Sequence, residues 1–180
     1  MKNKVLKNKF ANAISTYLYL LDSPKINEIR KLIVSTKNNS GEIFLFGNGA
    51  SASIANHVAV DFTKENKIRA RAFNNPSLLT CFSNDYGYKN LFKECIKSYV
   101  NKKDLCIFIS SSGELENVIN GSVFCKKIGI KSITLTGFKK NNSLSKTGQV
   151  NIHIDSKNYN VVETLHQTIL LSIVEDLKGN

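Results

Sequence analysis

The sequence predicts an α/β protein with a doubly wound, five-stranded parallel sheet flanked by helices. Five apolar segments recur along the chain, each of the length of a strand that is buried on both faces. Segments with helical spacing of apolar residues separate them, so consecutive strands are joined by crossovers and run parallel. Turns rich in glycine or serine follow the first and third segments, where such sheets bind ligands.

Two helices are predicted ahead of the first strand. Apolar residues recur at helical spacing between residues 3 and 21. Asp22-Ser23-Pro24 ends this helix and begins a second one, because proline is favoured in the first turn of a helix. The second helix ends near Gly41, and its apolar face packs either on its own sheet or on a second subunit.

The first strand and the turn behind it form the most informative stretch. Residues 43–46 are apolar and predict a buried strand. Gly47 and Gly49 flank Asn48 and permit backbone conformations that side chains would forbid. Ser51 then stands at the start of a helix, where free N–H groups and the positive end of the helix dipole attract anions.

The rest of the chain alternates between strands and helices in the same way. Further strands are predicted over residues 68–73, 104–109, 132–136 and 150–154. Further helices are predicted over residues 76–82, 91–99, 115–128 and 159–177, with a polar turn over residues 83–88.

Length and composition predict one cytoplasmic domain. In a chain of 180 residues, we assign residues 1–40 to the N-terminal helices and residues 41–180 to the α/β core. No apolar run approaches the roughly 20 residues of a membrane-spanning helix, and the basic N-terminus lacks the apolar core of a signal peptide. The four cysteines have no C-x-x-C spacing, which is typical of buried reduced thiols. We therefore expect no membrane partner.

The net charge of +11 favours an anionic partner, either a nucleic acid or a phosphorylated metabolite. The lysines are scattered along the chain, and no arginine-rich block or base-stacking motif interrupts them. A phosphorylated small molecule is therefore the favoured partner, and nucleic acid is disfavoured.

Three consecutive hydroxyls follow the third strand. Ser110, Ser111 and Ser112 precede Gly113 and a helix, so hydroxyls and backbone N–H groups meet at one turn. Such a turn holds an anion or simply caps the helix. Ser51 at the end of a neighbouring strand favours the phosphate interpretation. Neither turn has the pattern of a Walker loop or of G-x-G-x-x-G, so no nucleotide cofactor is predicted.

Two pairs of ionisable residues lie at helical spacing. His57 and Asp61 are four residues apart, and Glu163 and His166 are three apart on the last helix. Apolar neighbours predict that both pairs are buried, where charged groups are costly. Each pair is a surface contact, a ligand set for a divalent metal such as Zn²⁺, or a proton shuttle between adjacent sugar carbons. His153, on the fifth strand, is interpreted as structural.

These motifs together resemble the sugar isomerase (SIS) domain family and, within it, the phosphoheptose isomerases. The resemblance covers nearly the whole chain in order, through Gly47-Asn48-Gly49-Ala50-Ser51, Asn84-Asp85-Tyr86-Gly87-Tyr88, Ile109-Ser110-Ser111-Ser112-Gly113 and Ile133-Thr134-Leu135-Thr136-Gly137. It implies N-terminal helices used in assembly and a homotetramer with sites at the subunit interfaces.

The resemblance also implies roles for individual residues. The matching substrate-binding and phosphate-binding positions are Asn48, Gly49, Ala50, Ser51, Asn84, Asp85, Ser110, Ser111 and Ser112. His57 and Asp61 match two zinc ligands of the family, and the position of Asp61 is also that of the catalytic base. Glu163 falls where the family has a glutamine that contacts substrate and metal.

Three positions depart from the family pattern. Leu171 replaces a histidine that is both a catalytic residue and a zinc ligand in the family. Leu115 replaces the serine that completes the phosphate turn, and Glu114 before it carries a charge that opposes a phosphate unless it points away. Asp61 is one methylene shorter than the family's glutamate.

The resemblance predicts a sugar-phosphate aldose–ketose isomerase of carbohydrate or surface-polysaccharide precursor synthesis, most like sedoheptulose 7-phosphate isomerase. Asp61 or Glu163 moves a proton between C1 and C2 through an enediol, and His166 assists. Zn²⁺ held by His57, Asp61 and Glu163 polarises the carbonyl. The alternatives are a non-catalytic SIS module that senses a phosphosugar or binds a protein, and an isomerase for another sugar phosphate.

Overall fold

The computed structural model of the chain describes residues 8–178 and contains one five-stranded sheet. The strands are β1 (Ile43–Gly47), β2 (Ala70–Ala72), β3 (Leu105–Ser110), β4 (Lys131–Thr136) and β5 (Val150–His153). Their order in the sheet is β2-β1-β3-β4-β5, and every neighbouring pair is parallel. The predicted parallel α/β fold is confirmed.

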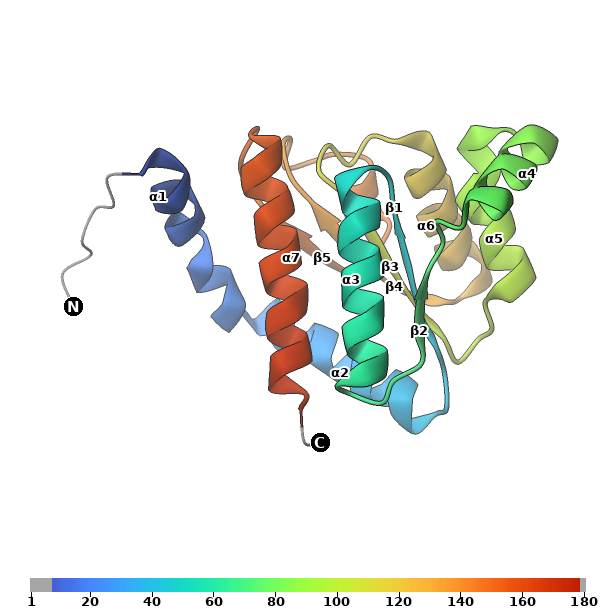
Figure 1. Cartoon of the computed structure of the whole chain (residues 1–180), viewed down its shortest axis with the longest axis horizontal. Helices are drawn as coiled ribbons and strands as arrows, with labels where there is room; N and C mark the ends of the chain where they lie inside the picture. The colour runs from blue at the N-terminus through green and yellow to red at the C-terminus, as the bar shows by residue number, and fades with distance from the viewer. Residues whose placement is uncertain (1–7, 179–180) are drawn as a thin grey trace.

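Helices cover both faces of this sheet (Figure 1). They are α1 (Lys9–Thr16), α2 (Pro24–Asn38), α3 (Ala50–Lys64), α4 (Pro76–Tyr86), α5 (Leu91–Tyr99), α6 (Glu116–Ile128) and α7 (Tyr159–Asp176). Buried residues of α2, α3 and α7 form one apolar cluster, and those of α5 and α6 form a second. Side chains of β1 contribute to both clusters, because successive side chains of a strand point to opposite faces of the sheet. Ile43 and Leu45 belong to the first cluster, and Phe44 and Phe46 to the second.

The second apolar cluster is rich in stacked aromatic rings. The ring of Phe46 stacks on those of Phe73 and Phe108 at centroid distances of 5.2 and 4.9 Å. Phe92 of α5 meets Phe46 edge-on at 5.3 Å. Offset and edge-to-face contacts at these distances are favourable beyond the burial of the rings, so they fix α5 against β1 and β3.

The structure decides where the N-terminal helices lie. Ile26, Ile29 and Ile33 of α2 are fully buried in the first cluster, so this helix packs on its own sheet rather than on a second subunit. The single helix expected up to residue 21 is divided within the described residues, because α1 ends at Thr16 and a 3₁₀ turn follows over Leu18–Asp22. Residues 3–7 lie outside the described part.

The polar turn expected over residues 83–88 is largely helical instead. Asn75 caps α4 by accepting hydrogen bonds from the N–H groups of Ser77 and Leu78. The helix then continues to Tyr86, so Asn84 and Asp85 lie in its last turn. Asn84, Asp85 and Tyr86, whose side chains suggested a turn, are exposed in the last turn of α4 and are compatible with a helix end.

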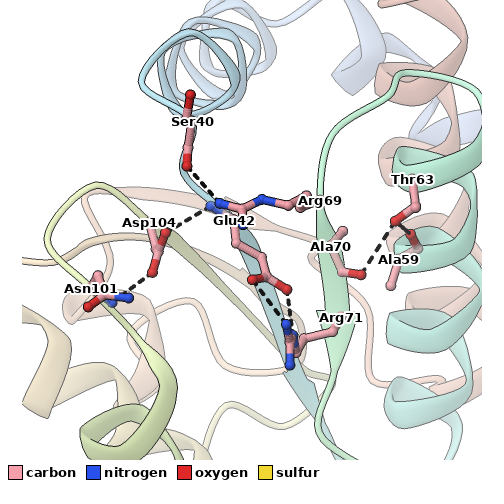
Figure 2. A network of polar contacts seen from close by, with 9 residues as sticks. All are labelled: Ser40, Glu42, Ala59, Thr63, Arg69, Ala70, Arg71, Asn101 and Asp104. Atoms are coloured by element: carbon pink, nitrogen blue, oxygen red, sulfur yellow. Dashed lines mark hydrogen bonds and ion pairs between the residues drawn. The ribbon is translucent and has the colours of Figure 1, made fainter.

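A network of hydrogen bonds and an ion pair lies at the amino ends of β1, β2 and β3 (Figure 2). The buried Asp104 carboxylate accepts hydrogen bonds from the N–H groups of Glu42 and Asn101, at 2.8 and 2.7 Å. Glu42 pairs with Arg71, and Arg69 donates to the carbonyl of Ser40 at 2.7 Å. The two backbone hydrogen bonds satisfy the buried charge of Asp104. This network lies at the end of the sheet opposite the two strand-end turns.

The cysteines are free, as predicted, but differ in burial. Cys95, Cys106 and Cys125 are buried, and burial raises the pKa of the Cys95 thiol to about 12. Cys81 is exposed on α4, so the prediction of a buried thiol is wrong at this position. Among residues 8–178, no helix has the length and apolar character that crossing a membrane requires.

His166 of α7 lies inside the fold, where it is fully buried. Its Nε2 is 3.2 Å from the carbonyl oxygen of Thr136 on β4, so Nε2 carries the proton and donates it. Burial lowers the pKa of the imidazole to about 4, because a charged ring would be poorly solvated there. The buried ring is therefore neutral at neutral pH.

This burial predicts a dependence of stability on pH. The pKa of His166 is 6.5 in the unfolded chain and about 4 in the folded one, so the unfolded state binds the extra proton between these values. The free energy of unfolding should therefore fall as the pH drops from about 6.5 to 4, by up to about 3 kcal/mol from this group. Urea unfolding at several pH values measures the slope.

His166→Gln, which keeps a donor for the Thr136 carbonyl, should flatten that slope. Thr168→Ala, on the same helix and without a titratable group, should keep it. Equal slopes in wild type and His166→Gln would contradict the assignment.

Candidate functional site

The two strand-end turns lie side by side at the carboxyl edge of the sheet. The chain leaves β1 for β2 on one side and returns to β3 on the other, so the strand order reverses between β1 and β3. In the register of this pair, Gly47 stands opposite Ile109. The turn over residues 47–51 and the serine turn over residues 110–113 are therefore neighbours, which confirms the spatial arrangement that the sequence predicted.

The first turn requires glycine at two positions. A Cβ on Gly47 would come within 2.7 Å of the Ser51 backbone, because α3 folds back directly over the end of β1. Gly49 has a φ of +54°, in the region that side chains disfavour, and serves as the N-cap of α3. These residues place Ser51, which is 4% exposed, in the first turn of the helix.

Asn48 ties the first turn to α6. Its Nδ2 donates to Oδ1 of Asn117 at 2.9 Å, and its Oδ1 accepts from Nδ2 of Asn117 at 3.1 Å. The hydroxyl of Tyr88 donates to the same oxygen of Asn48 at 2.9 Å. The Asn48 side chain thus fixes the position of the turn, and its contact with a substrate stays a prediction.

The serine turn folds around its own hydroxyls. Ser110 Oγ accepts from the N–H of Gly113 at 3.1 Å, and Ser112 Oγ accepts from the N–H of Glu114 at 3.3 Å. The hydroxyl of Ser111 instead donates to Oε1 of Glu163 at 3.4 Å. Ser111 therefore connects the turn to α7.

Glu114 directs its charge to the loop after β4. Its carboxylate accepts from the N–H of Ser143 at 3.1 Å and from the hydroxyl of Ser143 at 2.6 Å. The Ser143 hydrogen bond lowers the pKa of Glu114, which keeps the side chain ionised. The carboxylate is thus occupied by a partner outside the serine turn. Leu115 is the exposed N-cap of α6 and offers no side-chain hydrogen bond there.

A groove of about 640 Å³ runs between α1, α3 and α7. Figure 1 shows α3 and α7 side by side, and both begin at the carboxyl edge of the sheet. The groove is lined by Phe10, Ala50, Ser53, Ile54, His57, Asn160, Glu163, Thr164 and Gln167. It therefore combines a carboxylate, an imidazole, amides and hydroxyls with an apolar wall, as a polyhydroxylated ligand requires.

His57 and Asp61 form a pair on the outer side of α3. Nε2 of His57 is 3.2 Å from Oδ2 of Asp61, and the two side chains are 50% and 26% exposed. The expectation that this pair is buried is therefore wrong. Val58, Ala59 and Phe62 belong to the opposite side of α3, which faces the sheet, whereas Val60 is itself exposed. Nδ1 of His57 is 3.0 Å from the side-chain nitrogen of Gln167 on α7.

The second predicted pair is separated by the structure. Glu163 lines the groove, whereas His166 points inward and bonds to Thr136. His166 is not part of the groove lining, so a catalytic role for it has no support from its position. Leu171, where the family has a histidine, packs against the first apolar cluster.

Asn84 and Asp85 lie apart from the groove in the single chain. The amide of Asn84 donates to the carboxylate of Asp85 at 3.0 Å, and Cys81 contacts the same carboxylate at 3.6 Å. Figure 1 places α4, which carries them, on the far side of α3 from α7. Their predicted contact with a substrate stays a prediction.

The fit of a zinc ion depends on how many donors the fold brings together. Within residues 8–178, no three histidine, cysteine, aspartate or glutamate side chains are grouped as metal ligands. The predicted set of His57, Asp61 and Glu163 is thus not assembled, and both ring nitrogens of His57 have hydrogen-bonding partners. The donors of one chain do not fit zinc, and the chemistry proposed below uses none.

Several residues of this site were not predicted, and two of them hold predicted residues in place. Gln167 lies four residues after Glu163 and therefore on the same face of α7, a spacing that offered a signal. Asn117 lies within α6, and nothing in its local sequence indicates that it meets Asn48 across the strand ends.

Known proteins resemble this chain in sequence and in fold. The SIS domain model matches residues 9–137. The phosphoheptose isomerase of Thermodesulfovibrio yellowstonii is 34% identical over 161 residues, which cover 84% of this chain and 80% of that protein.

Solved structures share the fold. The phosphoheptose isomerase of Neisseria gonorrhoeae aligns with a TM-score of 0.86 at 23% identity, covering 94% of this chain and 92% of that one. The NanR protein of Vibrio vulnificus, complexed with ManNAc-6P, aligns with a TM-score of 0.70 at 16% identity, covering 93% of this chain and 60% of that one. The fold, the matched residues 9–137 and the identity to the curated relative together show that the chain belongs to the SIS domain family.

Proposed function

We propose that this chain is a phosphosugar isomerase that interconverts an aldose phosphate and a ketose phosphate, most like sedoheptulose 7-phosphate isomerase. The observation that carries the proposal is the contact between Ser111 of the serine turn and Glu163 of the groove. It joins the turn that we assign to the phosphate to a groove with acid–base groups, which are the two parts that isomerisation of a phosphosugar needs. Relatives named phosphoheptose isomerase support the sugar class.

The phosphate binds at the strand ends in this proposal. Ser51, Ser110 and Ser112 offer hydroxyls, and α3 and α6 offer their first N–H groups, at neighbouring strand ends, while the Ser111 hydroxyl has Glu163 as its partner. Glu114 does not oppose the phosphate from within the turn, because its carboxylate bonds to Ser143. The net charge of +11 attracts such an anion over a longer range.

Proton transfer occurs further along α3. Asp61 is not itself a lining residue, but its side chain is 26% exposed and it continues the face of α3 whose residues Ile54 and His57 line the groove, since positions three and four apart share a helix face. An ionised carboxylate there takes a proton from the carbon next to the carbonyl and returns it to the neighbouring carbon of the enediol. Glu163 contacts the substrate between the phosphate and this base. His166 is too deeply buried to reach it.

Asp61→Asn tests this assignment, because an amide cannot accept the proton. Wild type incubated with sedoheptulose 7-phosphate should form the aldose product, and Asp61→Asn should lower kcat by about 10²- to 10⁴-fold. Glu163→Gln, which introduces the residue of the family pattern, is the matched control and should retain most of kcat. Chromatography of the sugar phosphates measures both.

The outcomes also separate the alternatives. Loss of turnover in Glu163→Gln with turnover kept in Asp61→Asn would make Glu163 the base.

Leu171 favours a second candidate function, a non-catalytic module that senses a phosphosugar or binds a protein. That candidate predicts wild type that binds the phosphosugar without turnover, and an Asp61→Asn variant with unchanged affinity.

Leu115→Ser tests the phosphate site. A hydroxyl at the N-cap of α6 would add one hydrogen bond to the phosphate, worth about 1.5 kcal/mol or about tenfold in KM. We expect KM to fall while kcat stays the same, because the phosphate is bound equally in ground and transition states. Leu115→Ala removes the same bulk without the hydroxyl and should leave KM unchanged. Equal KM values in the two variants would contradict a phosphate at this turn.

We further propose a homotetramer in which the N-terminal helices make contacts between subunits. Within the described residues, α1 buries no side chain, and Leu18 and Tyr19 after it are 42% and 66% exposed. Light scattering coupled to size exclusion should give the mass of four 20.1 kDa chains. The double variant Leu18→Glu, Tyr19→Glu should give a smaller species, because it places charges on an apolar contact. Val123→Glu, at an equally exposed site on α6, should not.

A further inference from the structure

Gln167 of α7 contacts the base-bearing face of α3. Its side-chain nitrogen lies 3.0 Å from Nδ1 of His57, while Nε2 of the same ring lies 3.2 Å from Oδ2 of Asp61. One imidazole thus joins two helices that are distant in sequence. Gln167 also lines the groove.

For a neutral imidazole beside an ionised carboxylate, the chemistry of the three groups sets the direction of both hydrogen bonds. An ionised carboxylate only accepts, so the ring nitrogen beside Asp61 must carry a proton. In a neutral imidazole the other nitrogen then has a free lone pair and accepts from the amide NH₂ of Gln167. The donors point from Gln167 to His57 and from His57 to Asp61.

The contact between His57 and Asp61, which lies within α3, does not by itself hold the imidazole in one orientation. The His57 side chain is 50% exposed, and an exposed contact between residues one helical turn apart leaves the ring free to change rotamer. The bond from Gln167 comes from another helix that packs against α3. It therefore restrains the ring from the side that Asp61 does not reach.

We propose that Gln167 is a positioning residue for isomerisation. It fixes the Nε2–H tautomer of His57, and the ring in turn holds Oδ2 of Asp61 and leaves the second carboxylate oxygen for the substrate proton. The inference rests on the proposed function, because it assigns Asp61 as the base. It also makes His57 a donor to that base rather than a proton acceptor, since both ring nitrogens are engaged.

Nuclear magnetic resonance of the histidine ring nitrogens tests the tautomer directly. The chain has three histidines, and loss of one set of signals in His57→Gln identifies those of His57. Wild type should show the proton on Nε2. Gln167→Leu removes the donor at similar size and should give mixed tautomers, whereas Gln167→Glu replaces the donor by an acceptor and should add a proton on Nδ1, so that the ring becomes an imidazolium.

Kinetics supply the second measurement. Both variants should lower kcat by about 10- to 100-fold, the effect of a misplaced catalytic group, with KM nearly unchanged. Thr168→Ala, next to Gln167 but outside the groove lining, is the control and should behave as wild type. Circular dichroism and thermal melting establish that each variant is folded.

The two proposals fail in different ways. A proton on Nδ1 of His57 in wild type, or a tautomer and kcat unchanged in Gln167→Leu, would overturn the role of Gln167. Wild type with the Nε2–H tautomer but without turnover of any phosphosugar would overturn the isomerase function, while the hydrogen-bond directions would stand.

Discussion

The parallel pairing of β1 with β3 is the contact on which the rest of the site depends. The chain leaves β1 in one direction and returns to β3 from the other, so the helices that follow these strands diverge. α3 belongs to the apolar cluster of one face and α6 to that of the other. Two helix starts are thereby held next to each other without blocking the space between them. The close approach of Ser51 to Gly47 maintains this geometry, since no larger residue fits there.

The packing of α7 on α3 adds the second half of the site. Both helices begin at the carboxyl edge of the sheet and run in the same direction (Figure 1). Gln167 therefore faces His57 of α3, and Glu163, four residues nearer the start of α7, contacts Ser111 of the serine turn. Apolar residues on the inner faces of both helices supply the stability, and the groove between them presents polar side chains such as His57, Glu163 and Gln167. The groove thus lies on a rigid support, which is what precise placement of acid–base groups requires.

The departures from the family pattern are consistent with one another. Leu171 has joined the apolar cluster, so the position of the family's histidine now contributes packing instead of a donor atom. Glu163 places a carboxylate in the groove, and Gln167 engages the ring nitrogen of His57 that faces away from Asp61. Together they form a hydrogen-bonded site whose donors within one chain do not assemble around a metal. The family fold is retained, and the residues on α3 and α7 differ from the family pattern at Asp61, Glu163 and Leu171.

The sequence by itself determined the parallel sheet, the order of elements and the two strand-end turns. These features follow from local signals, because apolar runs, helical periodicity and glycine or serine turns are set by neighbouring residues. The sequence also indicated which face of α3 carries the candidate site, since His57 and Asp61 share a helix face. It did not determine which of the two helical histidines faces the groove.

Only the tertiary structure decided that question, because the packing of α7 turns His166 toward Thr136 and Glu163 toward Ser111. It likewise placed Glu114 on Ser143, joined Asn48 to Asn117 and brought Gln167 to His57. Each of these contacts joins residues that lie well apart in the chain. Their formation depends on how strands and helices pack in three dimensions, and spacing along the sequence does not encode it.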